Sequence, residues 1–193
     1  MTKKNNSSSA SGLPSCLNGQ RINTISEYLK REFGKKTIKL AIDGGFTCPN
    51  RDGSKGYGGC AFCSDTGSGE FSSDIDSQIA LLSDKWPDAA YLAYFQNHTN
   101  TYAPVEELRE KYFAILKDPR IKGLVIGTRP DCLGQDVLEL LDEINRTHFL
   151  WVELGLQTIH EETAKDFNRC YELDVFDEAM EDLRSLGIRT VVI

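Results

Sequence analysis

The chain has 193 residues, a formal net charge of −7 and ordinary apolar and charged fractions. Its length is sufficient for one domain with a sizeable hydrophobic core. Nucleic-acid-binding surfaces are usually basic, so the negative overall charge gives no support for nucleic-acid binding. It does not exclude a local basic patch. No apolar run approaches the roughly 18 residues that a membrane span needs, so we expect no membrane contact.

The composition of the first 20 residues predicts that they form a disordered polar tail. Residues 1–11 are polar and serine-rich and contain no apolar segment, which excludes a secretory signal within them. We therefore expect a cytoplasmic protein whose folded domain occupies residues 21–193.

The first predicted elements lead to a glycine-rich loop. Apolar residues share one helical face over residues 22–33, and Gly34 is a suitable C-terminal stop. Residues 37–42 alternate as a short strand. Residues 44–69 hold eight of the sixteen glycines, a composition that disfavours regular structure but lets backbone amides approach a ligand closely.

Strands and helices then alternate to the end of the chain. Further strands are predicted over residues 89–95, 123–127, 149–156 and 188–193, and further helices begin near residue 73 and at Pro104 or carry apolar stripes over 137–144 and 176–186. This order predicts an α/β fold with a parallel sheet of about five strands and right-handed crossovers. Because the last strand is apolar and nothing follows it, we expect the chain to be a C-terminally truncated part of a longer protein.

Unusual polar residues follow the predicted strands. In parallel α/β sheets, ligands bind at the carboxyl ends of the strands. We therefore expect one edge of the sheet to collect Gln96, Asn97, His98, Asn100 and Thr101, then Thr128, Arg129 and Asp131, then Glu153 and Gln157, and finally Asn168 and Arg169.

Three cysteines in the glycine-rich loop carry the strongest chemical signal. Cys48, Cys60 and Cys63 form a C-x-x-C pair with one further cysteine upstream. Three thiolates without an obvious fourth ligand indicate a metal centre with an open coordination position, where chemistry can occur.

Two other interpretations of these cysteines stay open. A structural zinc site in a non-catalytic α/β protein needs a fourth ligand, for which Cys16, Cys132, Cys170 and His98 are candidates without a familiar spacing. A thiol-redox protein would use Cys60 and Cys63 as a reversible pair.

Several motifs together carry a family resemblance. They are the run from Asp43 to Gly53, the run from Gly58 to Ser64, Tyr94-Phe95-Gln96 with Asn100-Thr101-Tyr102, Gly127-Thr128-Arg129-Pro130-Asp131, Glu153-Leu154-Gly155-Leu156-Gln157, and Asn168-Arg169. Over residues 20–193 the chain resembles the radical S-adenosylmethionine (SAM) enzymes. Within them it resembles the bacterial YhcC/YtqA-type branch, which is related to the catalytic subunit of the Elongator complex. The resemblance implies a partial (β/α) barrel.

The resemblance also implies cofactors and partners. Cys48, Cys60 and Cys63 would hold a [4Fe–4S] cluster whose fourth iron is chelated by SAM. Reductive cleavage of SAM would give a 5′-deoxyadenosyl radical that abstracts a hydrogen atom from the substrate. A one-electron reductant such as flavodoxin or ferredoxin would supply the electron, and the related branch points to tRNA, modified at the wobble uridine, as a possible substrate. No catalytic acid or base is assigned.

By the same resemblance, residues on the loop and the first strands would bind SAM. Phe62 would pack near the adenine, with anchoring of the loop in the core as the alternative. Gln96 stands where many relatives have a glycine-glycine-glutamate segment that meets the SAM amino group; the alternative is a glutamine that faces water. Thr128 is a further contact, and its neighbour Arg129 would reach SAM, an anionic substrate group or a surface salt-bridge partner.

Residues of the later segments complete this predicted set. The family places ribose or amino contacts at Glu153 and, with a weaker match, at Gln157. Arg169 matches the arginine that steadies the SAM carboxylate. The family continues the Asn-Arg pair with glycine and histidine, whereas this chain has Cys170 and Tyr171, so a step that depends on that histidine is in question.

Overall fold

The computed structural model describes residues 22–67 and 69–193, so the predicted tail and Cys16 lie outside the described residues. Five strands form one sheet in the order β1-β2-β3-β4-β5, and each neighbouring pair is parallel. The strands are β1 (Thr37–Ile42), β2 (Ala90–Phe95), β3 (Ile121–Thr128), β4 (Phe149–Leu154) and β5 (Arg189–Val192). In the described part of the chain β1 and β5 do not pair, so the sheet stays open. The expected α/β fold, a partial (β/α) barrel of about five strands, is confirmed.

Helices connect the strands in chain order. They are α1 (Ile25–Phe33), α2 (Ile75–Ser83), α3 (Val105–Leu116), α4 (Gln135–Thr147), α5 (Glu161–Asp166) and α6 (Leu173–Ser185), with a short 3-10 helix η2 (Pro130–Cys132) after β3. Among the described residues, no helix has the length and apolar character that crossing a bilayer requires.

The first helix shows how local sequence sets an element's bounds. The Thr24 side chain accepts a hydrogen bond from the Glu27 amide and caps the helix, so α1 begins at Ile25 rather than at Ile22. Gly34 ends it with φ 73°, and its amide donates to the Lys30 carbonyl.

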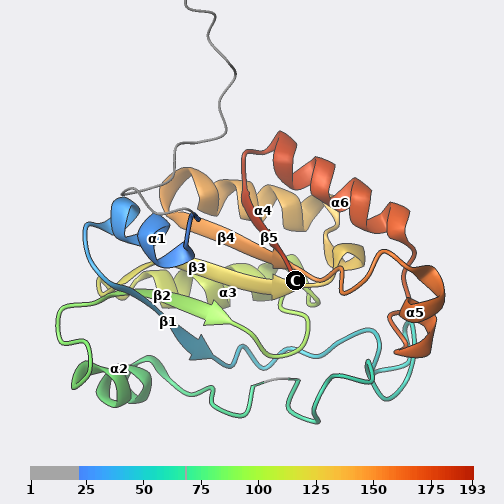
Figure 1. Ribbon diagram of the computed structural model, residues 1–193, viewed down its shortest axis with the longest axis horizontal. Helices are drawn as coiled ribbons and strands as arrows, with labels where there is room; N and C mark the ends of the chain where they lie inside the picture. Colours follow the sequence, from blue (N-terminus) through green and yellow to red (C-terminus); the bar gives the residue numbers. More distant parts are fainter. Residues whose placement is uncertain (1–21, 68) are drawn as a thin grey trace, which may run out of the picture.

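The two faces of the sheet are covered unequally (Figure 1). On one face, Leu124, Ile126 and Val152 belong to the main hydrophobic core, to which α3, α4 and α6 contribute. On the other face, the main cover is α1, whose Leu29 belongs to a smaller cluster with Leu92, Val125, Phe149 and Trp151. This second face is the concave side of the open barrel.

Two further differences from the sequence prediction concern the second half of the chain. The fourth strand ends at Leu154, because Leu156 and Gln157 leave the sheet and donate their amides to the Ile193 carbonyl. Helix α5 was not predicted, because its six residues are too few to show a helical apolar period.

Candidate metal and cofactor site

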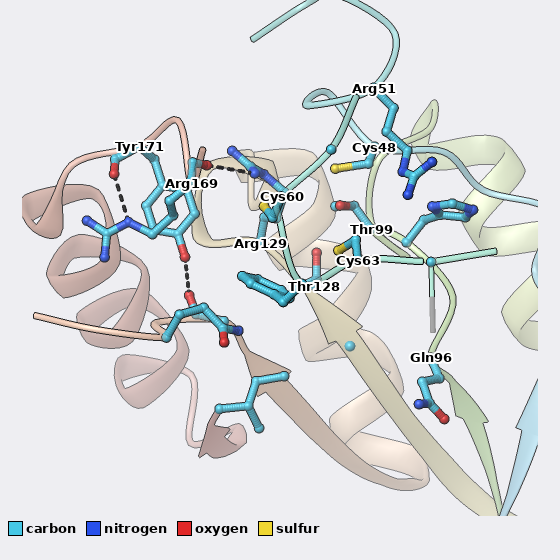
Figure 2. A pocket seen from close by; sticks show the side chains of 18 of the residues that line it. Cys48, Arg51, Cys60, Cys63, Gln96, Thr99, Thr128, Arg129, Arg169 and Tyr171 are labelled. Carbon is cyan, nitrogen blue, oxygen red and sulfur yellow. Dashed lines mark hydrogen bonds between the residues drawn. The ribbon is translucent and has the colours of Figure 1, made fainter. Parts of the chain in front are cut away.

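The predicted edge of the sheet holds a pocket of about 210 Å³. Cys48, Cys60 and Cys63 all line it, and Figure 2 shows their side chains grouped on the loop side. Residues from the ends of β2, β3 and β4 and from the segment after α5 complete the wall; they include Gln96, His98, Thr99, Thr128, Arg129, Gln157, Arg169 and Tyr171. The tertiary structure therefore brings the cysteine loop onto the carboxyl ends of the strands.

The loop reaches this position through a few tight backbone contacts. Gly58 and Gly59 have φ values of 77° and 79°, which favour glycine. The Gly59 amide donates to the Asn50 carbonyl at 2.8 Å, and the Cys63 amide donates to the Cys60 carbonyl at 2.9 Å. These contacts close the loop and keep the three cysteines on one side of it.

The surroundings favour the thiolate form of one cysteine. A hydrogen bond from the Cys60 thiol lowers the pKa of Cys63 to about 6, and the nearby Arg51 and Arg129 guanidiniums act in the same direction. The same bond, together with burial, raises the pKa of Cys60. Because the thiolate is the form that binds metal, the pocket prepares Cys63 as a ligand at neutral pH.

The donor set fits an iron–sulfur cluster better than a single ion. Within the described ranges, no three His, Cys, Asp or Glu side chains gather closely enough to hold one metal ion. A zinc site needs its sulfurs about 2.3 Å from one point, whereas a cluster takes each thiolate on a different iron and spreads the sulfurs around itself. Three cysteines around one pocket, next to two guanidiniums, suit an anionic cluster.

The predicted glutamines of the pocket have free side chains. Gln96 lies at the end of β2 and Gln157 after β4, and both line the pocket. Within residues 22–67 and 69–193, neither side-chain amide has a hydrogen-bond partner. Both amides are therefore available to a polar ligand.

Phe62 lies at the pocket but not in the core. Its side chain is 52% exposed. Its ring packs edge to face on Phe167, with the centroids 5.4 Å apart. The alternative that Phe62 anchors the loop in the core is therefore wrong, while its contact with adenine stays a prediction.

Thr128 and Arg129 line the pocket with protein partners already in place. The Thr128 hydroxyl shares a hydrogen bond of 2.5 Å with the Thr101 hydroxyl. Arg129 donates from Nε and Nη2 to both carboxylate oxygens of Asp131, at 2.9 and 2.8 Å. Both side chains of this ion pair are nearly buried, so the alternative of a surface salt bridge for Arg129 is wrong in its location, and a contact with SAM or an anionic substrate group stays a prediction.

Glu153 lies on the concave face of the sheet and is not among the residues that line the pocket. Its carboxylate accepts hydrogen bonds from Lys39 Nζ at 2.7 Å and from the Tyr94 hydroxyl at 2.5 Å. Tyr94 itself lines the pocket. Glu153 therefore supports the pocket wall through Tyr94, and a direct contact with SAM stays a prediction.

Arg169 lines the pocket but its guanidinium is bound to the protein. The side chain is 1% exposed and forms an ion pair with Glu161 at 2.8 Å. It also donates to the carbonyls of Leu156, Thr158 and Tyr171. Arg169 therefore holds together the segments that form this part of the pocket wall. Its contact with the SAM carboxylate stays a prediction.

Sequence reasoning missed several residues of the wall. Two guanidiniums lie near the Tyr171 ring, with Arg129 Cζ at 4.9 Å and Arg169 Cζ at 4.6 Å from its centroid. Thr99 is 1% exposed and also lines the pocket. Tyr171 departs from the family pattern, and this departure could have indicated that the residue belongs to the site. The sequence around Thr99 has no feature that indicates a role in the pocket.

Comparisons with known proteins agree with this geometry. The Radical SAM superfamily profile matches residues 48–193. YtqA of Bacillus subtilis (strain 168) is 48% identical over 178 residues, which cover 88% of this chain and 55% of that protein. YhcC of Escherichia coli (strain K12) is 39% identical over 173 residues, 87% of this chain and 56% of that protein. The chain thus spans about half the length of these relatives.

A more distant match is shorter. Elongator complex protein 3 of Schizosaccharomyces pombe is 32% identical over 91 residues, 46% of this chain and 16% of that protein. The superfamily match implies a [4Fe–4S] cluster and SAM as cofactors, and the cysteine loop has the donor set for them. The chain therefore belongs to the radical SAM superfamily and, by its relatives, to the branch that contains YtqA and YhcC.

Proposed function

We propose that this chain forms the core of an enzyme that cleaves SAM reductively and uses the resulting 5′-deoxyadenosyl radical to abstract a hydrogen atom from a substrate. The observation that carries the proposal is the pocket that joins Cys48, Cys60 and Cys63 to the strand ends. Cys48, Cys60 and Cys63 would hold the cluster, which would pass one electron from an external reductant to SAM for the cleavage of a carbon–sulfur bond.

The residues of the pocket have separable tasks in this proposal. The three cysteines hold the cluster. The free amides of Gln96 and Gln157 bind polar groups of SAM, and Phe62 covers the adenine. Gly127 and Gly155 at the ends of β3 and β4 also line the pocket and present no side chain to it, which lets the cofactor lie close to the backbone.

The remaining polar residues keep the wall rigid. The Arg129–Asp131 and Arg169–Glu161 ion pairs hold the two guanidiniums that lie near the Tyr171 ring. Glu153 and Lys39 fix Tyr94 from the concave face. A rigid wall keeps the reacting groups in place and limits the entry of water.

For partners, we propose a one-electron reductant such as flavodoxin or ferredoxin, and tRNA as substrate through its wobble uridine. The shared segment with Elongator complex protein 3 supports the tRNA proposal, whereas the net charge of −7 does not. In tRNA from cells that lack the protein, a modified wobble uridine should be missing. Complementation with the wild-type protein should restore it, and complementation with Cys63→Ala should not.

Cluster loading tests the reaction directly. Anaerobic reconstitution with iron and sulfide should give a brown protein with about four irons, and SAM with dithionite should then yield 5′-deoxyadenosine from the full-length protein that contains this chain. Cys63→Ala should lose both properties. Cys132→Ala should keep them, because Cys132 lies outside the pocket lining.

The same experiment separates the alternatives. Stoichiometric zinc without colour would favour a structural zinc protein, and a metal-free protein with a reversible disulfide would favour thiol-redox chemistry. Equal 5′-deoxyadenosine production by Cys63→Ala would contradict the ligand assignment.

A further inference from the structure

Asn50 is a fully buried polar residue in an otherwise largely accessible loop. Its side chain has 0% exposure, although its neighbours Arg51 and Asp52 are at least partly exposed. The Asn50 carbonyl accepts the Gly59 amide, and the Arg51 amide donates to the Cys48 carbonyl. The backbone at Asn50 therefore joins the segments that carry Cys48 and Cys60.

The Asn50 side chain points at one of the cysteine ligands. Its Nδ2 lies 3.3 Å from Cys60 Sγ and also donates to the Asn168 carbonyl. A carbonyl oxygen can only accept, so it fixes the orientation of the amide with the NH₂ group toward the sulfur. The two N–H groups of Nδ2 are thus divided between a sulfur and a carbonyl.

This arrangement leaves the Asn50 Oδ1 atom buried without a hydrogen-bond partner in the described part of the chain. A buried polar atom without a partner costs stability and calls for an explanation. A leucine of similar volume would avoid that cost. The presence of an asparagine at this position is explained if its N–H group donates a hydrogen bond to the Cys60 sulfur.

This hydrogen bond would become necessary once Cys60 binds a cluster. Cys60 Sγ lies 3.4 Å from the Asn168 carbonyl, which can accept the single thiol proton whenever that proton is not donated to Cys63. A thiolate on iron has no proton, so the sulfur and the carbonyl would face each other as two acceptors. The Asn50 amide donates to both atoms and relieves this repulsion.

We propose that Asn50 is a positioning residue that donates an N–H···S hydrogen bond to the Cys60 ligand and raises the reduction potential of the cluster. An N–H donor at a ligand sulfur stabilises the reduced, more negative cluster more than the oxidised one. The inference rests on the proposed function, because it requires a cluster at Cys60.

The test compares two Asn50 variants with a matched control. Asn50→Leu keeps the volume and removes the donor, and Asn50→Asp replaces it with a negative charge. Asn100→Leu is the control, because Asn100 is also 0% exposed and donates to two carbonyls, but of Phe95 and Gly127 rather than at a sulfur. The three variants and the wild-type chain are reconstituted anaerobically without SAM, and their iron content and midpoint potentials by electron paramagnetic resonance are measured.

We expect the midpoint potential to fall in the order wild type, Asn50→Leu, Asn50→Asp, and Asn100→Leu to match the wild type. Loss of iron from folded Asn50 variants, with full loading of Asn100→Leu, would also support the inference, because Cys60 would then be misplaced. Full iron content with unchanged potentials in both Asn50 variants would overturn it. A wild-type chain that takes up no cluster would overturn the proposed function as well, so the two failures are distinguishable.

Discussion

His98 and Arg51 illustrate how single residues shape the pocket. His98 has φ 58°, an uncommon backbone conformation for a non-glycine residue. A side chain at Gly67 would come within 2.4 Å of its Nδ1 atom, so the ring occupies space that only glycine leaves open. Both His98 and Arg51 line the pocket. The histidine is therefore confined beside a positive charge.

This confinement predicts the protonation state of His98. Burial lowers the pKa of His98 below its ordinary value, and the charge of Arg51 lowers it further, against a smaller opposite effect of Asp43. The imidazole is therefore neutral at pH 7. In the metal-free protein, Arg51→Gln should raise the pKa of His98, but not fully, because the burial remains.

Proton NMR titration can follow the three histidines of the chain individually. Lys55→Gln is the control, because Lys55 is exposed and contributes no effect on His98. An unchanged or lower pKa of His98 in Arg51→Gln would contradict the electrostatic argument.

At the scale of elements, the pairing of β3 with β4 depends on one glycine. Gly123 is paired with Phe149 in the parallel register. A Cβ atom at this position would lie 2.1 Å from the Phe149 carbonyl oxygen, which belongs to the backbone and cannot rotate away. The two strands can approach normally only while residue 123 has no side chain.

Gly123→Ala should therefore lower the free energy of unfolding by about 3 kcal/mol, as is typical of strong steric conflicts in a core. Urea unfolding measures this loss. Gly34→Ala is the comparison, because that position has open space and only its φ of 73° opposes a side chain, for a loss of about 1 kcal/mol. A Gly123→Ala protein as stable as Gly34→Ala would show that the strands can shift at little cost.

At the scale of the whole molecule, the cysteine loop links distant parts of the fold. It leaves β1, yet the Ala61 amide donates to the Phe167 carbonyl at 3.0 Å and the Asn168 side chain donates to the Gly59 carbonyl at 2.9 Å. The loop therefore spans the carboxyl edge of the sheet from β1 to the segment after α5 (Figure 1). A cluster bound to it would stabilise this connection.

Removal of the cluster should consequently lower the melting temperature of the chain and expose the loop. A ligand that binds only the folded state adds its binding free energy to stability. We expect the reconstituted protein to melt higher than the iron-free protein, and limited proteolysis of the iron-free form to cut within residues 51–58. Cys63→Ala should show the same melting temperature with and without iron. Equal melting temperatures of the two wild-type forms would contradict this coupling.

Much of the fold was predictable because its signals are local. The predicted strand over residues 37–42 coincides with β1, the helix expected to begin near residue 73 is α2, which begins at Ile75, and the predicted stop at Gly34 ends α1. The apolar pattern also indicated the five strands, although it began β3 two residues late. The short helix α5 had too few residues to show a period.

The site was predictable in part. The cysteine spacing and the strand ends identified the pocket, because parallel strands bring their carboxyl ends to one edge. Residue identity could not tell Gln96, which has a free amide, from Arg169, whose guanidinium is bound to Glu161 and three carbonyls. It also could not show that Glu153 turns to Lys39 rather than into the pocket.

By itself, the sequence determined the α/β order, the three cysteines and the edge of the sheet where they lie, since periodicity and spacing are properties of neighbouring residues. Only the tertiary structure decided which polar side chains are free for a ligand and which are bound to the protein. Hydrogen bonds such as those from Asn50 to Asn168 and from Lys39 to Glu153 join residues more than 100 positions apart. Such partners are set by how the chain packs, and no local pattern records them.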